Sequence, residues 1–384
     1  MIRSTGTIDR RSFIGGAAAF AALSGCASLP HRCGPGAADA APWFEFGSDG
    51  EFRFLQITDL HLKFADGRLH PRVERILKAA FKKFRPSLLV LTGDNVSGQD
   101  DEVNAHGVFE KTVDPLLAVF DEYGVPFCVT FGNHDSERVG ANRYTRQGQY
   151  DYYKSKGGRL FVDHDVPDLP GVGSGVVRLV TRGTRQTAFN LFVMDSGSYL
   201  ERRQKNGRLD YDACRTEQIA WYERVSGDVP CLWFQHIIVP DVNVHSIFVD
   251  APPTSDAAAK EGPQTGYDML CPEGTRRRLL APGARGELKE HPHPANWATY
   301  RNAEHTFEGR TLYDSWRKMG NLKGAFFGHD HKNSYWGADE NGIVLGATKC
   351  CSLWTYNDGN PGVRAFTVRP DGTYETQIFA ESDI

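Results

Sequence analysis

The chain has no excess of basic residues, no Cys-x-x-Cys pair, no internal repeat and, beyond its N-terminus, no long apolar run. Lys and Arg number 44 against 48 Asp and Glu, a formal net charge of −4. This balance lacks the positive footprint of sequence-independent nucleic-acid binding, so we expect no specific nucleic-acid partner. Without paired cysteines we assign no metal to a thiolate cage. No later segment reaches the roughly 18 to 20 apolar residues of a membrane-spanning helix, so the mature chain is not expected to span a membrane.

The composition is that of a loop-rich globular protein. Of 384 residues, 40% are hydrophobic and 24% charged, with 40 Gly and 20 Pro, which excludes disordered, collagen-like and disulfide-miniprotein classes. Eight cysteines are too irregularly spaced for a disulfide framework. Cys128 and Cys231 lie in apolar runs and are interpreted as buried thiols, whereas a strained bridge between adjacent Cys350 and Cys351 stays open.

The N-terminus has the pattern of an export signal. Arg10 and Arg11 precede an apolar stretch from Phe13 to Leu23 that ends at Cys26. The paired arginines resemble a twin-arginine signal, and Leu23-Ser24-Gly25-Cys26 resembles a bacterial lipobox. We therefore expect residues 1–25 to be a signal peptide, 26–50 a flexible tether, and the product a periplasmic or cell-surface lipoprotein held to the membrane only by lipid on Cys26. A buried N-terminal helix is the alternative.

From residue 51 to 384 the pattern predicts one layered α/β domain, because short apolar runs alternate with segments of helical period. The first part predicts strands at 52–58, 88–92 and 126–131 and helices at 72–84 and 108–123. Further strands are expected at 190–194, 231–235, 324–327, 343–345, 364–368 and 373–379, and helices at 215–223 and 309–319. Residues 240–308, rich in Pro, Gly and Asp, break the pattern and are interpreted as an inserted loop, either a lid over a site or a poorly ordered segment.

Carboxylate, amide and imidazole groups follow the predicted strands at five separate places. They occur in Asp59-Leu60-His61, Gly93-Asp94-Asn95, Gly132-Asn133-His134-Asp135, Gln235-His236 and Gly328-His329-Asp330-His331. Because side chains at the carboxyl ends of strands converge on one crevice, groups distant in sequence can share a site. Oxygen and nitrogen donors without thiolate suit Fe, Mn or Zn, and they are more numerous than one tetrahedral ion needs.

This series resembles the calcineurin-like metallophosphoesterases, with D-x-H, G-D, G-N-H-D, H and G-H-x-H in that order over residues 52–384. The resemblance implies a four-layer α-β-β-α sandwich, two mixed sheets flanked by helices, with a dinuclear metal centre. It implies that one metal is bound by Asp59, His61 and His331, the other by Asn133, His236 and His329, with Asp94 as the bridge. His134 would act on the phosphate, with Asp135 as its orienting carboxylate.

The expected activity is metal-dependent phosphoester hydrolysis, in which the metal pair acidifies a bridging water that attacks phosphorus. The substrate would be a small phosphoester or a phosphorylated surface molecule. Gly93-Asp94-Asn95-Val96 lacks the arginine of serine/threonine phosphatases, and Ser97 replaces the tyrosine of purple acid phosphatases. The phrases around Asp59, Asn133 and His236 resemble the non-purple, Dcr2-like group most. The alternatives are a phosphodiesterase or nuclease-like activity, or a silent phosphoester-binding surface protein.

Secondary candidates are clustered in two segments. Tyr144, Tyr150, Tyr152 and Tyr153 follow the Asn133 turn, and whether they border the site is left open. The insertion contributes Arg276-Arg277-Arg278 and four histidines, His245, His291, His293 and His305. A solvated basic face is the default interpretation of such an arginine run.

Overall fold

The computed structural model describes residues 41–64, 67–99, 102–137, 142–203, 209–245, 247–250, 278–290 and 292–384. The predicted signal peptide, Cys26 and most of the predicted tether lie outside these residues. The tether boundary is wrong at its C-terminal end, because β1 (Trp43–Glu45) pairs in parallel with β5 (Gly175–Val180) and buries Phe44. An apolar side chain that fills the core draws this short segment into the fold. Within the described ranges, no helix combines the length and the apolarity that crossing a membrane requires.

Two mixed sheets form the centre of the molecule. The five-stranded sheet has the order β16-β15-β2-β3-β4. Its strands are β2 (Phe52–Ile57), β3 (Leu88–Thr92), β4 (Phe127–Thr130), β15 (Gly362–Val368) and β16 (Tyr374–Ala380). Strands β2, β3 and β4 are parallel, whereas β15 pairs antiparallel with both β2 and β16.

The seven-stranded sheet has the order β1-β5-β6-β9-β12-β14-β13. Its other strands are β6 (Thr187–Met194), β9 (Cys231–Gln235), β12 (Leu322–Phe327), β13 (Trp336–Ala338) and β14 (Val344–Ala347). Strands β6, β9, β12 and β14 run parallel, and antiparallel strands β5 and β13 extend this block. Two hairpins stand apart from both sheets: β7 (Tyr199–Arg203) with β8 (Leu209–Tyr211), and β10 (Phe248–Asp250) with β11 (Arg278–Leu280).

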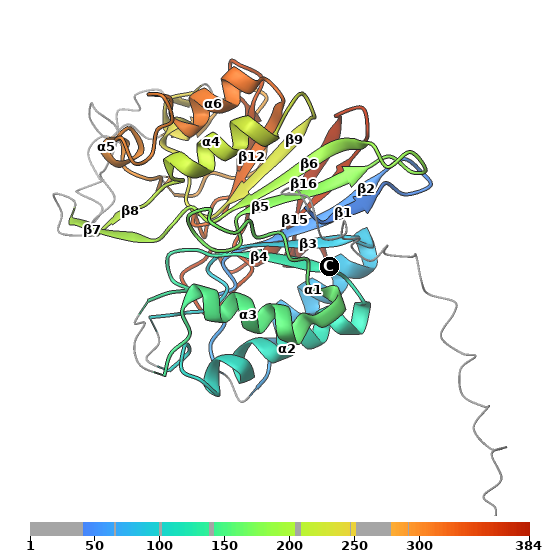
Figure 1. Ribbon diagram of the computed structural model, residues 1–384. Coiled ribbons are helices and arrows are strands. Elements are labelled where there is room, and N and C mark those ends of the chain that lie inside the picture. Colours follow the sequence, from blue (N-terminus) through green and yellow to red (C-terminus); the bar gives the residue numbers. More distant parts are fainter. Residues whose placement is uncertain are drawn as a thin grey trace, which may run out of the picture.

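Helices cover the outer face of each sheet (Figure 1). Helices α1 (Pro71–Phe84), α2 (Val108–Tyr123) and α3 (Arg146–Gly157) lie on the five-stranded sheet. Helices α4 (Thr216–Val225) and α6 (Leu312–Met319) lie on the seven-stranded sheet, and the short α5 (Trp297–Tyr300) lies beside them. Three-residue or four-residue 3₁₀ turns occur at Gly158–Leu160, Pro240–Asn243 and Glu381–Asp383. The four-layer α-β-β-α sandwich is confirmed.

The layers are held by three apolar clusters. One lies between the two sheets and stacks Phe54 on Phe366, with Phe234 edge-on to both rings. The other two lie under the helices, where α1 buries Val73, Ile76, Leu77, Ala80 and Phe81 at helical spacing. Close packing of this kind fixes the sheets relative to each other, and with them the strand ends that carry the polar motifs.

The predicted strands and helices are all present, with shifts of one to three residues at most boundaries. The sequence reasoning missed α3, β1, β5, β13 and the β7–β8 hairpin. It also missed the β10–β11 hairpin and α5, which lie in the segment interpreted as an inserted loop. Helix α3 was missed because its period is weak: of its twelve residues only Gln149, Tyr150 and Tyr153 are buried. Hairpin β7–β8 was missed because charged residues interrupt its alternation.

Candidate metal centre

The polar motifs meet where the parallel strands of both sheets end. Asp59 and His61 follow β2, Asp94 follows β3, and Asn133 follows β4. From the other sheet, His236 follows β9, while His329 and His331 follow β12. None of these seven side chains is more than 6% exposed. The two sheets therefore deliver all seven predicted donors to one buried region, as the strand-end argument predicted.

The backbone turns sharply at the donors. Asp59, His61, Asp94 and His329 all have positive φ, between 42° and 74°, a region that non-glycine residues seldom adopt. The amide of Asp59 donates to the Gly93 carbonyl at 3.0 Å, and that of His61 to the Asp94 carbonyl at 2.8 Å. Gly132 makes room for the carboxylate, because a Cβ there would lie 2.3 Å from Asp94 Oδ1. Strain of this kind collects at functional sites.

Four donors form one group. Single ligand atoms from Asp59, His61, Asp94 and His331 lie within 4.8 Å of one another. His331 Nε2 is 3.2 Å from Asp59 Oδ1, and His61 Nε2 is 3.4 Å from Asp94 Oδ2. The Nε2 atoms of His61 and His331 face each other at 3.1 Å. Convergence of imidazole nitrogens on carboxylate oxygens is the donor arrangement of a metal site.

A second group shares Asp94 with the first. Ligand atoms of Asp94, His236 and His329 also lie within 4.8 Å of one another. His236 Nε2 is 3.1 Å from Asp94 Oδ2, yet neither atom has a hydrogen-bond partner. The two atoms are close but not aligned as donor and acceptor, so both remain available to a ligand.

The donors also pass a direct test of fit to metal ions. Asn133 Oδ1 is, like His236 Nε2 and Asp94 Oδ2, buried without a hydrogen-bond partner. Leaving a buried polar atom unpaired costs about 1–3 kcal/mol, and more if it is charged. Cations among these atoms would satisfy them together, and mixed nitrogen and oxygen donors suit Mn, Fe or Zn.

In several donor side chains, the nitrogen that faces away from the centre is held by a hydrogen bond. His236 Nδ1 lies 2.9 Å from the Thr92 carbonyl, and His331 Nδ1 lies 2.9 Å from the Tyr356 carbonyl. Each bond leaves Nε2 to face the centre. Asn133 Nδ2 donates to the Tyr199 hydroxyl at 2.8 Å, which turns Oδ1 inward.

Burial and charge together set the protonation of the donors. Burial lowers the pKa of His61 to about 3 and that of His329 well below its usual value. Burial opposes ionisation of Asp94, but the charges of His236 and His134 outweigh it and hold the pKa of Asp94 well below its usual range. Ionised carboxylates and neutral imidazoles are the forms that bind metals. Burial opposes the charge of His236, but Asp94 raises its pKa to about 9, so this imidazole gives up a proton when a metal binds.

His134 is oriented by a residue other than the one predicted. Its Nδ1 lies 2.7 Å from Glu137 Oε2. The Asp135 carboxylate instead accepts from the amides of Asp94, Asn95, Val96 and Gly132 at 2.7–3.0 Å. Asp135 therefore ties the turn after β3 to the turn after β4. Four backbone amides engage the Asp135 carboxylate and Glu137 contacts the imidazole, so the predicted role of Asp135 is corrected.

Arg146, at the start of α3, is a partly buried residue that connects two segments near the site and that the sequence reasoning missed. Its guanidinium donates to the carbonyls of Gly132 and Gly197 and pairs with Asp195. Burial opposes the charge, but Asp195 raises the pKa of Arg146. The side chain thereby joins the Asn133 turn to the segment that leads into β7. Its position after a polar loop gave no sequence signal.

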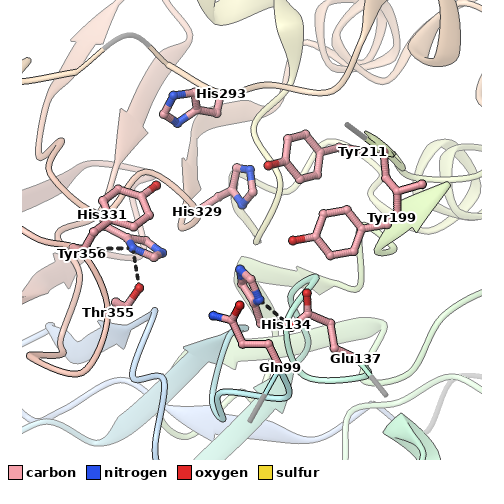
Figure 2. A pocket seen from close by; sticks show the side chains of 11 residues that line it. Gln99, His134, Glu137, Tyr199, Tyr211, His293, His329, His331, Thr355 and Tyr356 are labelled. Atoms are coloured by element: carbon pink, nitrogen blue, oxygen red, sulfur yellow. Dashed lines mark hydrogen bonds and ion pairs between the residues drawn. The ribbon is translucent and has the colours of Figure 1, made fainter. Parts of the chain in front are cut away.

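The centre opens into a pocket of about 670 Å³. Figure 2 shows His134 and Glu137 on one side, His293 on the other, and Tyr199 and Tyr211 with their hydroxyls toward the interior. The lining residues are Gln99, His134, Glu137, Tyr199, Leu209, Tyr211, His293, His329, His331, Thr355 and Tyr356. A substrate in this space would touch both a donor group and His134.

Comparison with protein families decides the assignment. Residues 52–333 match the family described as calcineurin-like phosphoesterase, which covers more than half of the chain. The chain belongs to this family. The donor clusters therefore lie in a phosphoesterase of a metal-dependent family.

Relatives of the phosphoesterase include a "Probable inactive purple acid phosphatase 28" of Arabidopsis thaliana, 24% identical over 76% of this chain and 68% of the relative. Phosphatase DCR2 of Saccharomyces cerevisiae is 25% identical over 39% of this chain and 28% of the relative. A probable cyclic nucleotide phosphodiesterase of Psychrobacter arcticus is 33% identical over 23% of this chain and 32% of that protein. Apart from the first, these matches span about half of the relative's length or less. Among solved structures, GAP50 of Plasmodium covers 86% of this chain and 85% of its own, at a TM-score of 0.43 and 11% identity.

Among the described residues of the insertion, one histidine contributes to the site. His293 lines the pocket, and its Nδ1 lies 3.1 Å from Asp330 Oδ1. His245 contacts Glu340, and His305 contacts Asp212 at 2.7 Å, so both are structural. His291 and the side chains of Arg276 to Arg278 lie outside the described residues. Asp330, Glu290 and His293 could also gather round a cation, but Asp330 accepts from Asn333 Nδ2 and Glu290 from the Lys332 amide.

Four tyrosines near the Asn133 turn do not line the pocket. Tyr144, Tyr150, Tyr152 and Tyr153 pack instead on the core beneath α3. The pocket tyrosines are Tyr199, Tyr211 and Tyr356, which come from later segments. Cys128 and Cys231 are buried free thiols, as predicted, and Cys350 and Cys351 are not bridged.

Proposed function

We propose that the phosphoesterase hydrolyses its substrate with two metal ions, one held by Asp59, His61 and His331 and the other by Asn133, His236 and His329. Asp94 would be shared between them. The observation that carries this proposal is the overlap of two donor groups at the single carboxylate of Asp94. One ion alone would leave part of the buried donor set unpaired.

When bound, the metal pair would clamp the phosphoryl oxygens and lower the pKa of a water that attacks phosphorus in line. The chain's own residues supply the rest. His134 faces the pocket and donates to the phosphoryl or leaving oxygen. Glu137, bonded to Nδ1, keeps the other edge of the imidazole toward the substrate. No covalent enzyme intermediate is needed.

The experiment compares para-nitrophenyl phosphate with its bis-ester, using protein stripped of metal and reloaded with Mn, Fe, Zn or Mg. Asp94→Ala is the inactive reference, and Tyr152→Phe, which removes one hydroxyl contact to Asp114 far from the pocket, is the matched control. Metal-restored turnover in the wild type and control but not in Asp94→Ala supports the proposal. The preferred ester then assigns monoesterase or diesterase. Two bound ions without turnover of either ester would instead favour a phosphoester-binding protein.

We also propose that the chain is exported as a folded, metal-loaded protein and anchored by lipid on Cys26. The support is Arg10-Arg11 followed by an apolar stretch and a small-residue break before that cysteine. Twin-arginine export would let the metals be selected before export. Labelled palmitate should enter the wild type but not Cys26→Ser. Replacing both arginines with lysine should leave the chain in the cytoplasm, and unchanged export would contradict the signal assignment.

A further inference from the structure

The β7–β8 hairpin touches two donors of the same metal position. Tyr199, at the start of β7, accepts a hydrogen bond from Asn133 Nδ2 at 2.8 Å. Tyr211, at the end of β8, meets the ring of His329 edge-on, with centroids 4.4 Å apart and planes at 83°. These two tyrosines are direct partners in the hairpin register, and their rings lie 5.6 Å apart. One antiparallel pair therefore contacts both Asn133 and His329.

The hairpin is firmly attached to the Asn133 turn. Ser198 Oγ, next to Tyr199, donates to the Asn133 carbonyl at 3.1 Å. The Arg146 guanidinium bridges the carbonyls of Gly132 and Gly197. On the other strand, Asp210 accepts from Thr299 Oγ1 at 2.9 Å, which joins β8 to α5. Both strands are thus braced by side chains at the open end of the hairpin, although the hairpin belongs to neither sheet.

The amide of Asn133 explains why such bracing matters. An asparagine can present either its oxygen or its NH₂ group, and only the oxygen binds a cation. Asn133 Oδ1 is buried without a partner, while Nδ2 is engaged by Tyr199. Without that acceptor the amide could rotate, and its buried NH₂ group would lose its partner. The tyrosine hydroxyl therefore selects the orientation that binds metal.

We propose that the β7–β8 hairpin, through Tyr199 and Tyr211, sets the metal affinity of the Asn133–His236–His329 position selectively. Tyr199 is a positioning residue that orients the amide of Asn133, and Tyr211 is one that buttresses the ring of His329. The proposal rests on the dinuclear centre proposed above. It assigns to a segment outside both sheets the control of one metal position of the pair.

The test is metal titration of the purified full chain, with ions counted by mass spectrometry and affinities measured by calorimetry. Wild type should bind two equivalents. Tyr199→Phe keeps the ring and removes only the acceptor for Asn133. It should lower the affinity for the ion at the Asn133–His236–His329 position, here called the second equivalent, by about 10- to 100-fold, the usual cost of losing an outer hydrogen-bond partner. The affinity for the other ion, the first equivalent, should not change. Tyr211→Ala should act on the same equivalent, and Tyr152→Phe on neither.

The outcomes separate the two proposals. A wild type that binds only one equivalent contradicts the dinuclear centre itself. A wild type with two equivalents, together with a Tyr199→Phe variant of unchanged affinities, overturns the role of the hairpin alone. Equal weakening of both equivalents, with a lower melting temperature of the metal-free protein, would also overturn it, because that result means general loosening. Asn133→Asp, whose two oxygens make the amide orientation irrelevant, should restore the second equivalent in the Tyr199→Phe background.

Discussion

The two sides of the metal centre are supported in different ways. On the first side, defined as Asp59, His61 and His331, main-chain groups share the support with nearby side chains: Thr58 Oγ1 donates to Asp59 Oδ2 at 2.9 Å, and the Tyr356 ring stacks on His331 with centroids 4.1 Å apart. The Tyr356 carbonyl holds His331, and the Asp59 carboxylate accepts from the His329 amide at 3.0 Å. On the second side, defined as Asn133, His236 and His329, two of the three donors lie against tyrosine side chains of a hairpin outside both sheets.

The difference teaches which parts of the centre sequence change can tune. A carbonyl acceptor is present whatever the side chain at its residue, so the hydrogen bond between the Tyr356 carbonyl and His331 Nδ1 survives substitution of Tyr356. A tyrosine acceptor disappears with one substitution. We therefore expect the second metal position to be the adjustable one, and the predictions below set the shared carboxylate against groups that belong to one side.

Asp94→Ala should have the largest effect, because the shared carboxylate belongs to both sides. Both metal ions should be lost and turnover should fall to background. The measurement is metal content together with hydrolysis of para-nitrophenyl phosphate. Retention of one tightly bound ion would break the comparison, because it would mean that the two sides do not share Asp94.

Asp135→Ala should have the next largest effect. It removes the carboxylate that accepts from four backbone amides and so ties the turn after β3 to the turn after β4. Each amide left unpaired costs about 1–3 kcal/mol, partly relieved by water. We expect the free energy of unfolding to fall by several kcal/mol, with weaker binding on both sides. Chemical denaturation of the metal-free protein measures this loss. A stable variant that has lost activity alone would restore a role for Asp135 in catalysis.

His134→Ala should separate chemistry from metal binding. The imidazole lines the pocket but is not among the donor groups, so both ions should remain. Turnover should fall by about 10²- to 10⁴-fold, the usual contribution of a general acid. Metal analysis and kcat on the same preparation check both expectations. Metal loss equal to that of Asp94→Ala would refute the distinction.

Glu137→Gln should produce a smaller loss than His134→Ala. The amide can still accept one hydrogen bond from Nδ1 of His134 but no longer carries charge. We expect turnover to drop by about 10- to 100-fold with both ions retained. Steady-state kinetics with Asp135→Asn alongside tests which carboxylate supports the imidazole. We expect Glu137→Gln to lose turnover at unchanged stability, whereas Asp135→Asn should lose stability. The reverse result would mean that Asp135 orients the imidazole.

Thr355→Val should have the smallest effect and sharpens the contrast between the two sides. Thr355 Oγ1 lies 3.2 Å from His331 Nδ1, but the Tyr356 carbonyl is nearer at 2.9 Å and remains. The first equivalent should therefore lose less than about 1 kcal/mol of binding free energy. Calorimetric titration beside Tyr199→Phe gives the comparison. A loss as large as that of Tyr199→Phe would show that both sides depend on side chains.

The sequence predicted the metal donors but not the residues that orient them. The donors could be predicted because they sit at the carboxyl ends of strands whose apolar runs, such as Leu88–Thr92, are plain in the sequence. The residues that hold the donors and His134 in place could not be predicted in this way. The partner of His134 was misplaced because Asp135 and Glu137 are both near in sequence, and only the turn geometry decides between them.

The hairpin was beyond sequence reasoning for a different reason. Tyr199 contacts Asn133 across 66 positions, and Tyr211 reaches His329 from another strand of the hairpin. Such contacts depend on tertiary packing, which local pattern does not encode. The tyrosines that were candidates from the sequence, such as Tyr150 in α3, pack on the hydrophobic core instead.

The most direct test of the central claim is a crystal structure of the manganese-loaded protein with anomalous scattering recorded for the metal. The account predicts two peaks about 3.5–4 Å apart, both in contact with Asp94, one beside His331 and the other beside Asn133. A single peak, or a second peak away from Asp94 among Glu290, His293 and Asp330, would contradict it.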